Sequence, residues 1–176
     1  KLTWRHPYLG YDIKREVNPK EVVKHLLKHK MCGVANGRAE FGPRALGNRS
    51  LIADPREPIK DTVNEVKRRE KFRPFAPAIL EEYAEEYFEG PMNRYMQFVS
   101  KSKHDYSSVT HVDGTSRVQV VEKDCVSVIR PILEEWYDKT GCPMLLNTSL
   151  NIRGKPMVNT WEHANDFEKE TKVKVF

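Results

Sequence analysis

The segment from Gly37 to Arg49 constrains the fold most strongly, because its mixture of glycine and arginine cannot belong to an apolar core. It reads GRAEFGPRALGNR, with glycines at 37, 42 and 47 and arginines at 38, 44 and 49. Glycine lets the backbone adopt positive φ or pass close to a ligand. Arginine carries a planar set of donors that suits phosphate and carboxylate oxygens. A solvated loop of turns is the alternative, but we interpret the segment as an anion-binding loop.

The net charge of +5 is concentrated around this loop. Ten basic and six acidic side chains lie between Arg38 and Arg73, so about one fifth of the 176 residues carries +4. A local positive field attracts phosphorylated metabolites or nucleic acid, and charge alone does not choose between them. The sequence has no apolar run long enough to cross a bilayer and no signal-peptide pattern, so we expect no membrane partner.

Cysteine and histidine usage argues against a disulfide frame or a metal site. Cys32, Cys125 and Cys142 are odd in number and widely spaced, which is typical of a reducing, cytoplasmic setting. The one i, i+4 histidine pair, His25 and His29, lies among lysines without an adjacent acid. A solvated helix face explains this pair better than metal binding, and we therefore expect no metal ligands.

The apolar spacing predicts a mixture of helices and strands. Helices are expected at residues 20–30, 58–66, 81–89, 131–139 and 162–170. Strands are expected at residues 31–35, 50–53, 73–80, 95–99, 116–121 and 144–146. Two prolines in 73–80 indicate an edge or irregular strand. This mixture predicts an α/β or α+β fold with one domain over residues 20–176, and residues 1–19 are expected to be a tail or the remnant of a linker.

Two pairs of polar residues are spaced so that their side chains would share one face of an extended segment. Lys67 and Arg69 would present two cations if the chain is extended there, and Ser149 and Asn151 would present a hydroxyl and an amide. The second pair follows the apolar run that ends at Leu146, and open α/β sheets bind ligands beyond their strand ends. Each pair alone is a weak motif, because Lys-x-Arg is more often a solvated helix face.

The combined set is far more specific. Lys67-x-Arg69-Glu70, Arg73-Pro74 and Ser149-x-Asn151 together resemble the signature of YrdC-type domains that form carbamoyl-adenylate. Four longer stretches resemble the C-terminal domain of the O-carbamoyltransferases that modify nodulation factors and antibiotics: residues 37–50, 72–77, 111–119 and 145–151. The resemblance extends over about residues 20–170. It departs from the family at Leu150, where phenylalanine is usual.

The resemblance implies a twisted open sheet with flanking helices and a concave basic cleft, in which ATP and carbamoyl phosphate form carbamoyl-adenylate. The catalytic residues it implies are Lys67, Arg69, Ser149 and Asn151. The residues it implies for binding ATP or carbamoyl phosphate are Arg38, Arg44, Arg73, Arg117 and Asn147. Mg²⁺ would be carried by ATP. The family's large N-terminal domain, which holds a metal and the acceptor site, would be a partner within the same longer protein.

A double-stranded RNA or tRNA-binding module without catalysis is the alternative function, because phosphate backbones attract lysine and arginine without regard to sequence. Arg44, Arg73 and Arg117 argue against it, since they lie in glycine- and proline-shaped or strand contexts rather than over one exposed helix. A nucleic-acid partner is therefore not favoured. A fragment that binds nucleotide without turnover is a third alternative, and the sequence does not identify the carbamoyl acceptor.

Overall fold

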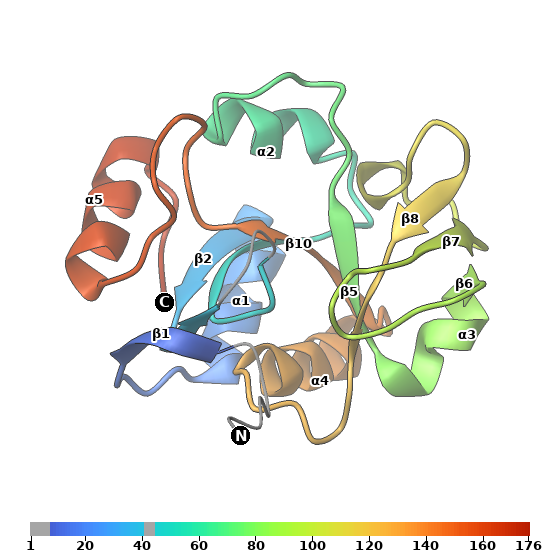
Figure 1. Cartoon of the computed structure of the whole chain (residues 1–176), viewed down its shortest axis with the longest axis horizontal. Helices are drawn as coiled ribbons and strands as arrows, with labels where there is room; N and C mark the ends of the chain where they lie inside the picture. The colour runs from blue at the N-terminus through green and yellow to red at the C-terminus, as the bar shows by residue number, and fades with distance from the viewer. Residues whose placement is uncertain (1–7, 41–44) are drawn as a thin grey trace, which may run out of the picture.

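The computed structural model describes residues 8–40 and 45–176 (Figure 1). The helices are α1 (Pro19–His29), α2 (Lys60–Val66), α3 (Ala84–Tyr87), α4 (Ile129–Thr140) and α5 (Trp161–Thr171), with 3₁₀ turns η1 (Glu81–Tyr83) and η2 (Ser107–Val109). The strands are β1 (Tyr8–Ile13), β2 (Met31–Ala35), β3 (Gly37–Glu40), β4 (Arg49–Ala53), β5 (Ala76–Leu80), β6 (Phe88–Glu89), β7 (Val99–Ser102), β8 (Thr115–Arg117), β9 (Gln119–Val121) and β10 (Met144–Ser149).

A five-stranded sheet in the order β2-β4-β10-β5-β9 forms the centre of the molecule. Its strand pairs are antiparallel except for β5 and β9, which run parallel. The last residues of the chain extend the sheet beyond β2. Gly33 donates its N–H to the Lys174 carbonyl, and Phe176 donates to the Gly33 carbonyl. The C-terminus therefore covers what would be an exposed sheet edge.

Apolar residues bury both faces of this sheet. Alternate β10 residues face opposite ways, so Leu145 packs with Leu26 of α1 and Trp136 of α4, whereas Leu146 packs with Val63 of α2 and Phe167 of α5. Figure 1 shows α2 on the opposite side of β10 from α4. Two smaller sheets, β1-β3 and β6-β7-β8, complete the fold. The mixed α/β architecture with flanking helices is as the sequence predicts.

Local signals explain the helix ends. The Asn18 side chain accepts a hydrogen bond from the Lys20 N–H at 3.0 Å at the start of α1. Gly141 ends α4 with φ +72°, a left-handed conformation that glycine adopts without steric cost. Thr160 and His163 cap the start of α5 reciprocally. The helices expected at 20–30, 131–139 and 162–170 are confirmed, as are the strands at 31–35, 50–53 and 144–146.

Several expectations about the elements are wrong. The strand β5 is interior, between β10 and β9, rather than at an edge. Its Pro77 is tolerated because the pairing with β9 begins only at Ala78, so no ladder hydrogen bond there requires a Pro77 N–H. The expected tail is not irregular throughout, since Tyr8–Ile13 form β1 and pair with β3.

Three further segments differ from the sequence pattern. Residues 95–98 are not extended, because Met96 has φ +56°, and the strand begins at Val99. The acidic segment 81–89 divides into η1, α3 and β6. Residues 116–121 divide at Val118, so that β8 joins the small sheet and β9 joins the central one. Alternation in the sequence predicts extended chain but does not indicate which sheet receives it.

Candidate functional site

A pocket of about 440 Å³ lies where β10 ends and β5 begins. The two strands are antiparallel, with Asn147 opposite Ala76, so the carboxyl end of one meets the amino end of the other. The pocket is lined by Ala45, Arg69, Arg73, Pro74, Phe75, Ala76, Met96, Arg117, Asn147, Thr148 and Ser149. Five of the residues expected at the site are in this set, and none of these lining residues is acidic. The pocket is therefore suited to an anion.

Lys67 lies behind the pocket wall and joins the two short motifs. It is only 3% exposed, and its ammonium donates to the Ser149 carbonyl, to Ser149 Oγ at 3.2 Å and to Asn151 Oδ1 at 3.0 Å. Burial lowers the pKa of Lys67 to about 7, and the nearby charges of Arg69 and Arg73 act in the same direction. Residues more than 80 positions apart are thus brought together as the resemblance implies.

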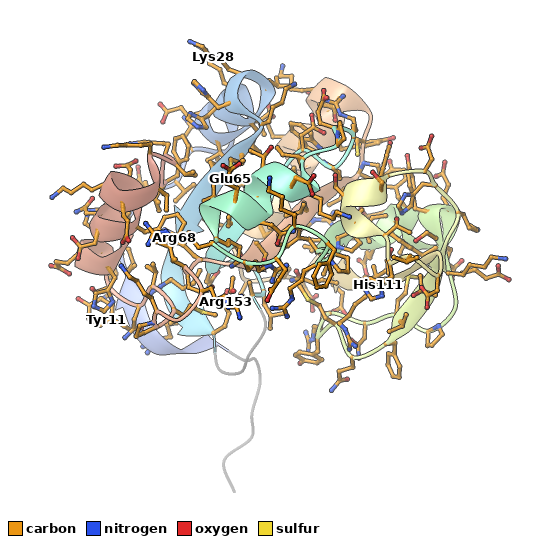
Figure 2. All side chains as sticks on the ribbon, turned by 90° about the horizontal axis from the view of Figure 1, so that it is seen from above. Tyr11, Lys28, Glu65, Arg68, His111 and Arg153 are labelled. Carbon is orange, nitrogen blue, oxygen red and sulfur yellow. The ribbon has the colours of Figure 1, made fainter. Side chains whose placement is uncertain are left out.

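Lys67 and Arg69 do not reach the site along the extended segment that their spacing predicts. Residues 67–69 are not extended, because Lys67 caps α2 and Arg68 has φ +54°. The turn directs the Arg68 side chain to Glu170, at 3.1 Å. Figure 2 shows Arg68 beside α2, with Arg153 on the same face. Lys67 and Arg69 therefore both reach the site through a turn, and the prediction of a shared face of an extended segment is wrong.

Arg69 is held rigidly at the pocket. Its Nε donates to Asn64 Oδ1 at 2.6 Å, and its guanidinium carbon lies 4.2 Å from the centre of the Phe75 ring. Asn64 is fully buried and also donates to the Arg73 carbonyl at 2.9 Å, which fixes the loop that follows. Burial, followed by the charge of Arg73, lowers the pKa of Arg69 to about 10. The arginine therefore remains charged near neutral pH.

Asn147 is the most buried polar residue in the pocket, at 2% exposure. Its amide group donates to the Ala45 carbonyl at 3.1 Å and to Gln119 Oε1 at 2.7 Å. Among the described residues no donor bonds to its Oδ1. A buried acceptor without a donor lowers the stability of the folded chain. Such an acceptor is typical of a group that binds a ligand. Gln119 fixes which way the amide points.

The other arginines expected at the site differ in burial and in their place relative to the pocket. Arg117 is half-buried and donates to the Met96 carbonyl at 3.2 Å, whereas Arg73 is exposed and lies 3.9 Å from Glu70. Arg38 is an exposed residue of β3 and is not among the residues that line the pocket. Arg44 lies outside the described residues. The roles assigned to these arginines stay predictions.

The glycine- and arginine-rich segment has a structural part that the sequence did not distinguish. Arg49 is fully buried, and within the described part of the chain its guanidinium donates to backbone carbonyls, those of Tyr11, Asn36, Gly37, Asn48 and Asn159. The Glu40 carboxylate accepts the Asn48 and Arg49 N–H groups at 2.7 and 2.9 Å. Within the segment interpreted as an anion-binding loop, Arg49 therefore has a structural part: it ties β1, β3 and β4 together.

Sequence reasoning missed four residues that shape the pocket: Asn64, Met96, Gln119 and Thr148. Gln119 and Thr148 lie within the stretches that carry the family resemblance, so the motifs could have indicated them. Asn64 lies in an ordinary helical pattern, and Met96 lies in an irregular segment before β7. Neither carries a local signal, because their positions depend on packing between distant elements.

Comparisons with known proteins identify the family of this chain. Residues 23–176 match the protein family described as Carbamoyltransferase C-terminus. Nodulation protein NolNO of Sinorhizobium fredii is 47% identical over 140 residues, which are 74% of this chain and 21% of that protein. Nodulation protein NolO of Bradyrhizobium diazoefficiens is 44% identical over 76% of this chain and 26% of its own length. The chain thus spans about a quarter of these relatives.

Solved structures show the same fold at low identity. The crystal structure of full-length HypF in its phosphate- and nucleotide-bound form superposes with a TM-score of 0.58, at 17% identity, over 93% of this chain and 21% of HypF. HypF from T. kodakarensis gives the same TM-score at 14% identity over 92% of this chain and 21% of its own. No helix within the described ranges is both long and apolar enough to span a membrane. With a family match that covers almost the whole chain, the protein belongs to the carbamoyltransferase C-terminus family.

Proposed function

We propose that this chain forms carbamoyl-adenylate from carbamoyl phosphate and ATP, as the C-terminal part of a longer O-carbamoyltransferase. The observation that carries the proposal is the meeting, in one pocket, of three arginines with the unpartnered Asn147 Oδ1. Arginines complement phosphoryl oxygens, and an amide oxygen accepts the N–H of a carbamoyl group. The bound phosphate and nucleotide named for HypF, which shares the fold, add support.

The proposed reaction releases phosphate and pyrophosphate. Water attacks the phosphorus of carbamoyl phosphate, the P–O bond breaks, and carbamate and phosphate form. A carbamate oxygen then attacks the α-phosphorus of ATP, and pyrophosphate leaves with the electrons of the broken P–O bond. Negative charge collects on phosphoryl oxygens in both steps. Fixed cations at Arg69, Arg73 and Arg117 would stabilise that charge without reorganisation.

Lys67, Ser149 and Asn151 form the second part of the proposed site. The Lys67 ammonium holds Ser149 and Asn151 in place through its three hydrogen bonds, and Ser149 lines the pocket. In this proposal they orient the nucleotide and the carbamoyl group. Mg²⁺ would enter with ATP, coordinated by phosphate oxygens and water.

The acceptor is proposed to bind elsewhere in the longer protein. About three quarters of each matched relative lies outside the matched stretch, because this chain covers 21% of NolNO and 26% of NolO. A further domain would take carbamoyl-adenylate from this pocket and transfer its carbamoyl group to a hydroxyl.

ATP–pyrophosphate exchange that depends on carbamoyl phosphate tests the proposal. The wild-type chain is expected to catalyse the exchange, and Arg117→Ala and Asn147→Ala are expected to lower its rate by at least tenfold, the effect of one lost charge-assisted or buried hydrogen bond of about 1.4 kcal/mol or more. Lys139→Ala on the exposed end of α4, where the side chain pairs with Glu135 at 4.0 Å, is the matched control. Exchange that needs no carbamoyl phosphate, or none at all with folded protein, would contradict the proposal.

A further inference from the structure

Ser149 and Lys67 have the geometry of a nucleophile with its base. Lys67 Nζ lies 3.2 Å from Ser149 Oγ, and Ser149 Oγ donates to Asn151 Oδ1 at 2.7 Å. Asn151 Oδ1 also accepts from Lys67 at 3.0 Å, so the three groups form a closed triangle. Ser149 lines the pocket, whereas Lys67 is buried behind it and does not. Ser149 is therefore the residue of the triangle that lines this pocket.

The triangle satisfies both protonation states of the lysine. As an ammonium, Lys67 has three N–H donors for three acceptors, namely the Ser149 carbonyl, Ser149 Oγ and Asn151 Oδ1. As a neutral amine it keeps two donors for the carbonyl and the amide oxygen, and its lone pair can accept the Ser149 hydroxyl after that hydroxyl rotates. Each of these polar groups keeps a hydrogen-bond partner when Lys67 loses its proton. A proton can thus pass from Ser149 to Lys67 without any rearrangement beyond one rotation.

We propose that Ser149 is an activated nucleophile and that carbamoyl donors modify it covalently. Ser149 Oγ attacks the carbonyl carbon of carbamoyl phosphate, the bond from that carbon to the phosphate oxygen breaks, and phosphate leaves. The hydroxyl proton passes to Lys67. The product is an O-carbamoyl serine. With cyanate the same oxygen adds across the C=N bond of isocyanic acid, whose nitrogen takes up the proton, and nothing leaves.

This modification would regulate the pocket rather than serve turnover. A carbamate ester is a far weaker carbamoyl donor than a mixed anhydride, because the serine alkoxide is a much poorer leaving group than phosphate. The ester would therefore persist and block the pocket when carbamoyl phosphate is present without ATP. The carbamoyl phosphate step rests on the proposed function, whereas reactivity toward cyanate and sulfonyl fluorides depends only on the triangle.

Covalent labelling of the purified chain tests the proposal, with three separate probes: phenylmethylsulfonyl fluoride, cyanate and carbamoyl phosphate. Intact mass and peptide mapping locate the modified residue. We expect all three to label Ser149, with a rate that rises as pH passes through about 7, where Lys67 becomes neutral. Ser149→Ala should abolish the label. Ser102→Ala, which removes a hydroxyl outside the pocket that pairs with Ser116 Oγ at 2.7 Å, should leave it unchanged.

The lysine is tested with a variant that keeps its charge. Lys67→Arg cannot act as a base and should lower the labelling rate by about 100-fold, the scale of general-base catalysis. Should this variant unfold, Asn151→Ala gives an independent measure: it removes the acceptor that competes for the Ser149 hydroxyl and should shift the pH midpoint without abolishing the label.

The outcomes distinguish this proposal from the proposed function. Absence of any label on Ser149 from phenylmethylsulfonyl fluoride and cyanate would overturn the nucleophile, as would carbamoylation confined to Lys67. Labelling of Ser149 at the same rate in Lys67→Arg and at every pH would overturn the role of the lysine. Labelling by those two probes but not by carbamoyl phosphate would uphold the nucleophile and contradict the binding of carbamoyl phosphate in this pocket.

Discussion

Lys67 Nζ and Asn151 Oδ1 lie 3.0 Å apart although 84 positions separate the two residues. This bond joins the end of α2 to the loop after β10, and so holds the lysine motif against the serine motif. The neighbouring Arg69 is directed into the pocket by the same turn. The arrangement places the cations of Lys67 and Arg69 in one group, and the loss of either cation has measurable consequences.

Loss of a cation from this group should weaken nucleotide binding. Arg69→Ala is expected to reduce ATP affinity by about 1.5–3 kcal/mol, the scale of a charge-assisted hydrogen bond. Lys67→Ala is expected to reduce it indirectly, because Ser149 and Asn151 lose the ammonium that holds them. Isothermal titration calorimetry measures the change, and Lys139→Ala, outside the pocket, is the control. Unchanged affinity in both variants would remove these residues from the nucleotide site.

The buried lysine should also make stability depend on pH. The pKa of Lys67 is about 7 in the folded chain against 10.5 for an ordinary lysine, so between these values the unfolded chain binds the extra proton. The free energy of unfolding should therefore rise with pH over this range, and fall toward neutral pH. Urea unfolding of wild type and Lys67→Met at several pH values isolates this contribution, because the variant lacks the titrating group. Parallel pH profiles for the two proteins would contradict it.

Two arginines of the glycine-rich segment should differ sharply in their effect on stability. Arg49→Ala leaves several partly buried carbonyls without donors, each at a cost of about 1–3 kcal/mol, so the free energy of unfolding should fall by at least about 3 kcal/mol. Arg38→Ala, at an exposed position in β3, should change it by no more than about 0.5 kcal/mol. Chemical denaturation of both variants gives the comparison, and equal losses would be inconsistent with a structural role for Arg49.

Salt dependence separates a nucleotide pocket from an RNA-binding surface. ATP affinity should fall only modestly as salt rises, whereas any affinity for duplex RNA should fall steeply because many counterions are released together. Titrations at two salt concentrations with ATP and with a short RNA duplex measure both slopes. Tight RNA binding at physiological salt, combined with no ATP binding, would favour the alternative of an RNA-binding module.

This chain by itself should form carbamoyl-adenylate without transferring the carbamoyl group to an acceptor. We expect it to support exchange between ATP and pyrophosphate, but not to carbamoylate sugars or other alcohols, because the proposed acceptor domain lies in the remainder of a longer protein. Mass spectrometry of candidate acceptors after incubation with ATP and carbamoyl phosphate measures the transfer. A carbamoylated acceptor would show that this segment contains its own acceptor site.

Much of the local structure could be predicted, because it depends on neighbouring residues. Apolar spacing in α1, α4 and α5, and the glycine after α4, determine where those helices lie. The apolar run that leads into Asn147 and Ser149 also indicated a ligand site at the end of β10. The structure brings the lysine and serine motifs together, although residues 67–69 form a turn rather than an extended segment.

Features that depend on long-range contacts were decided only by the tertiary structure. Arg38 and Arg49 have the same chemistry in the same segment, but burial among carbonyls from β1, β3 and the loop before α5 makes Arg49 structural. Pro77 indicated an edge strand, yet β5 is interior because β9 pairs only beyond the proline. Burial behind Ser149 gives Lys67 its lowered pKa. Sequence spacing reports local geometry, whereas desolvation and hydrogen-bond partners depend on segments that meet only in the folded chain.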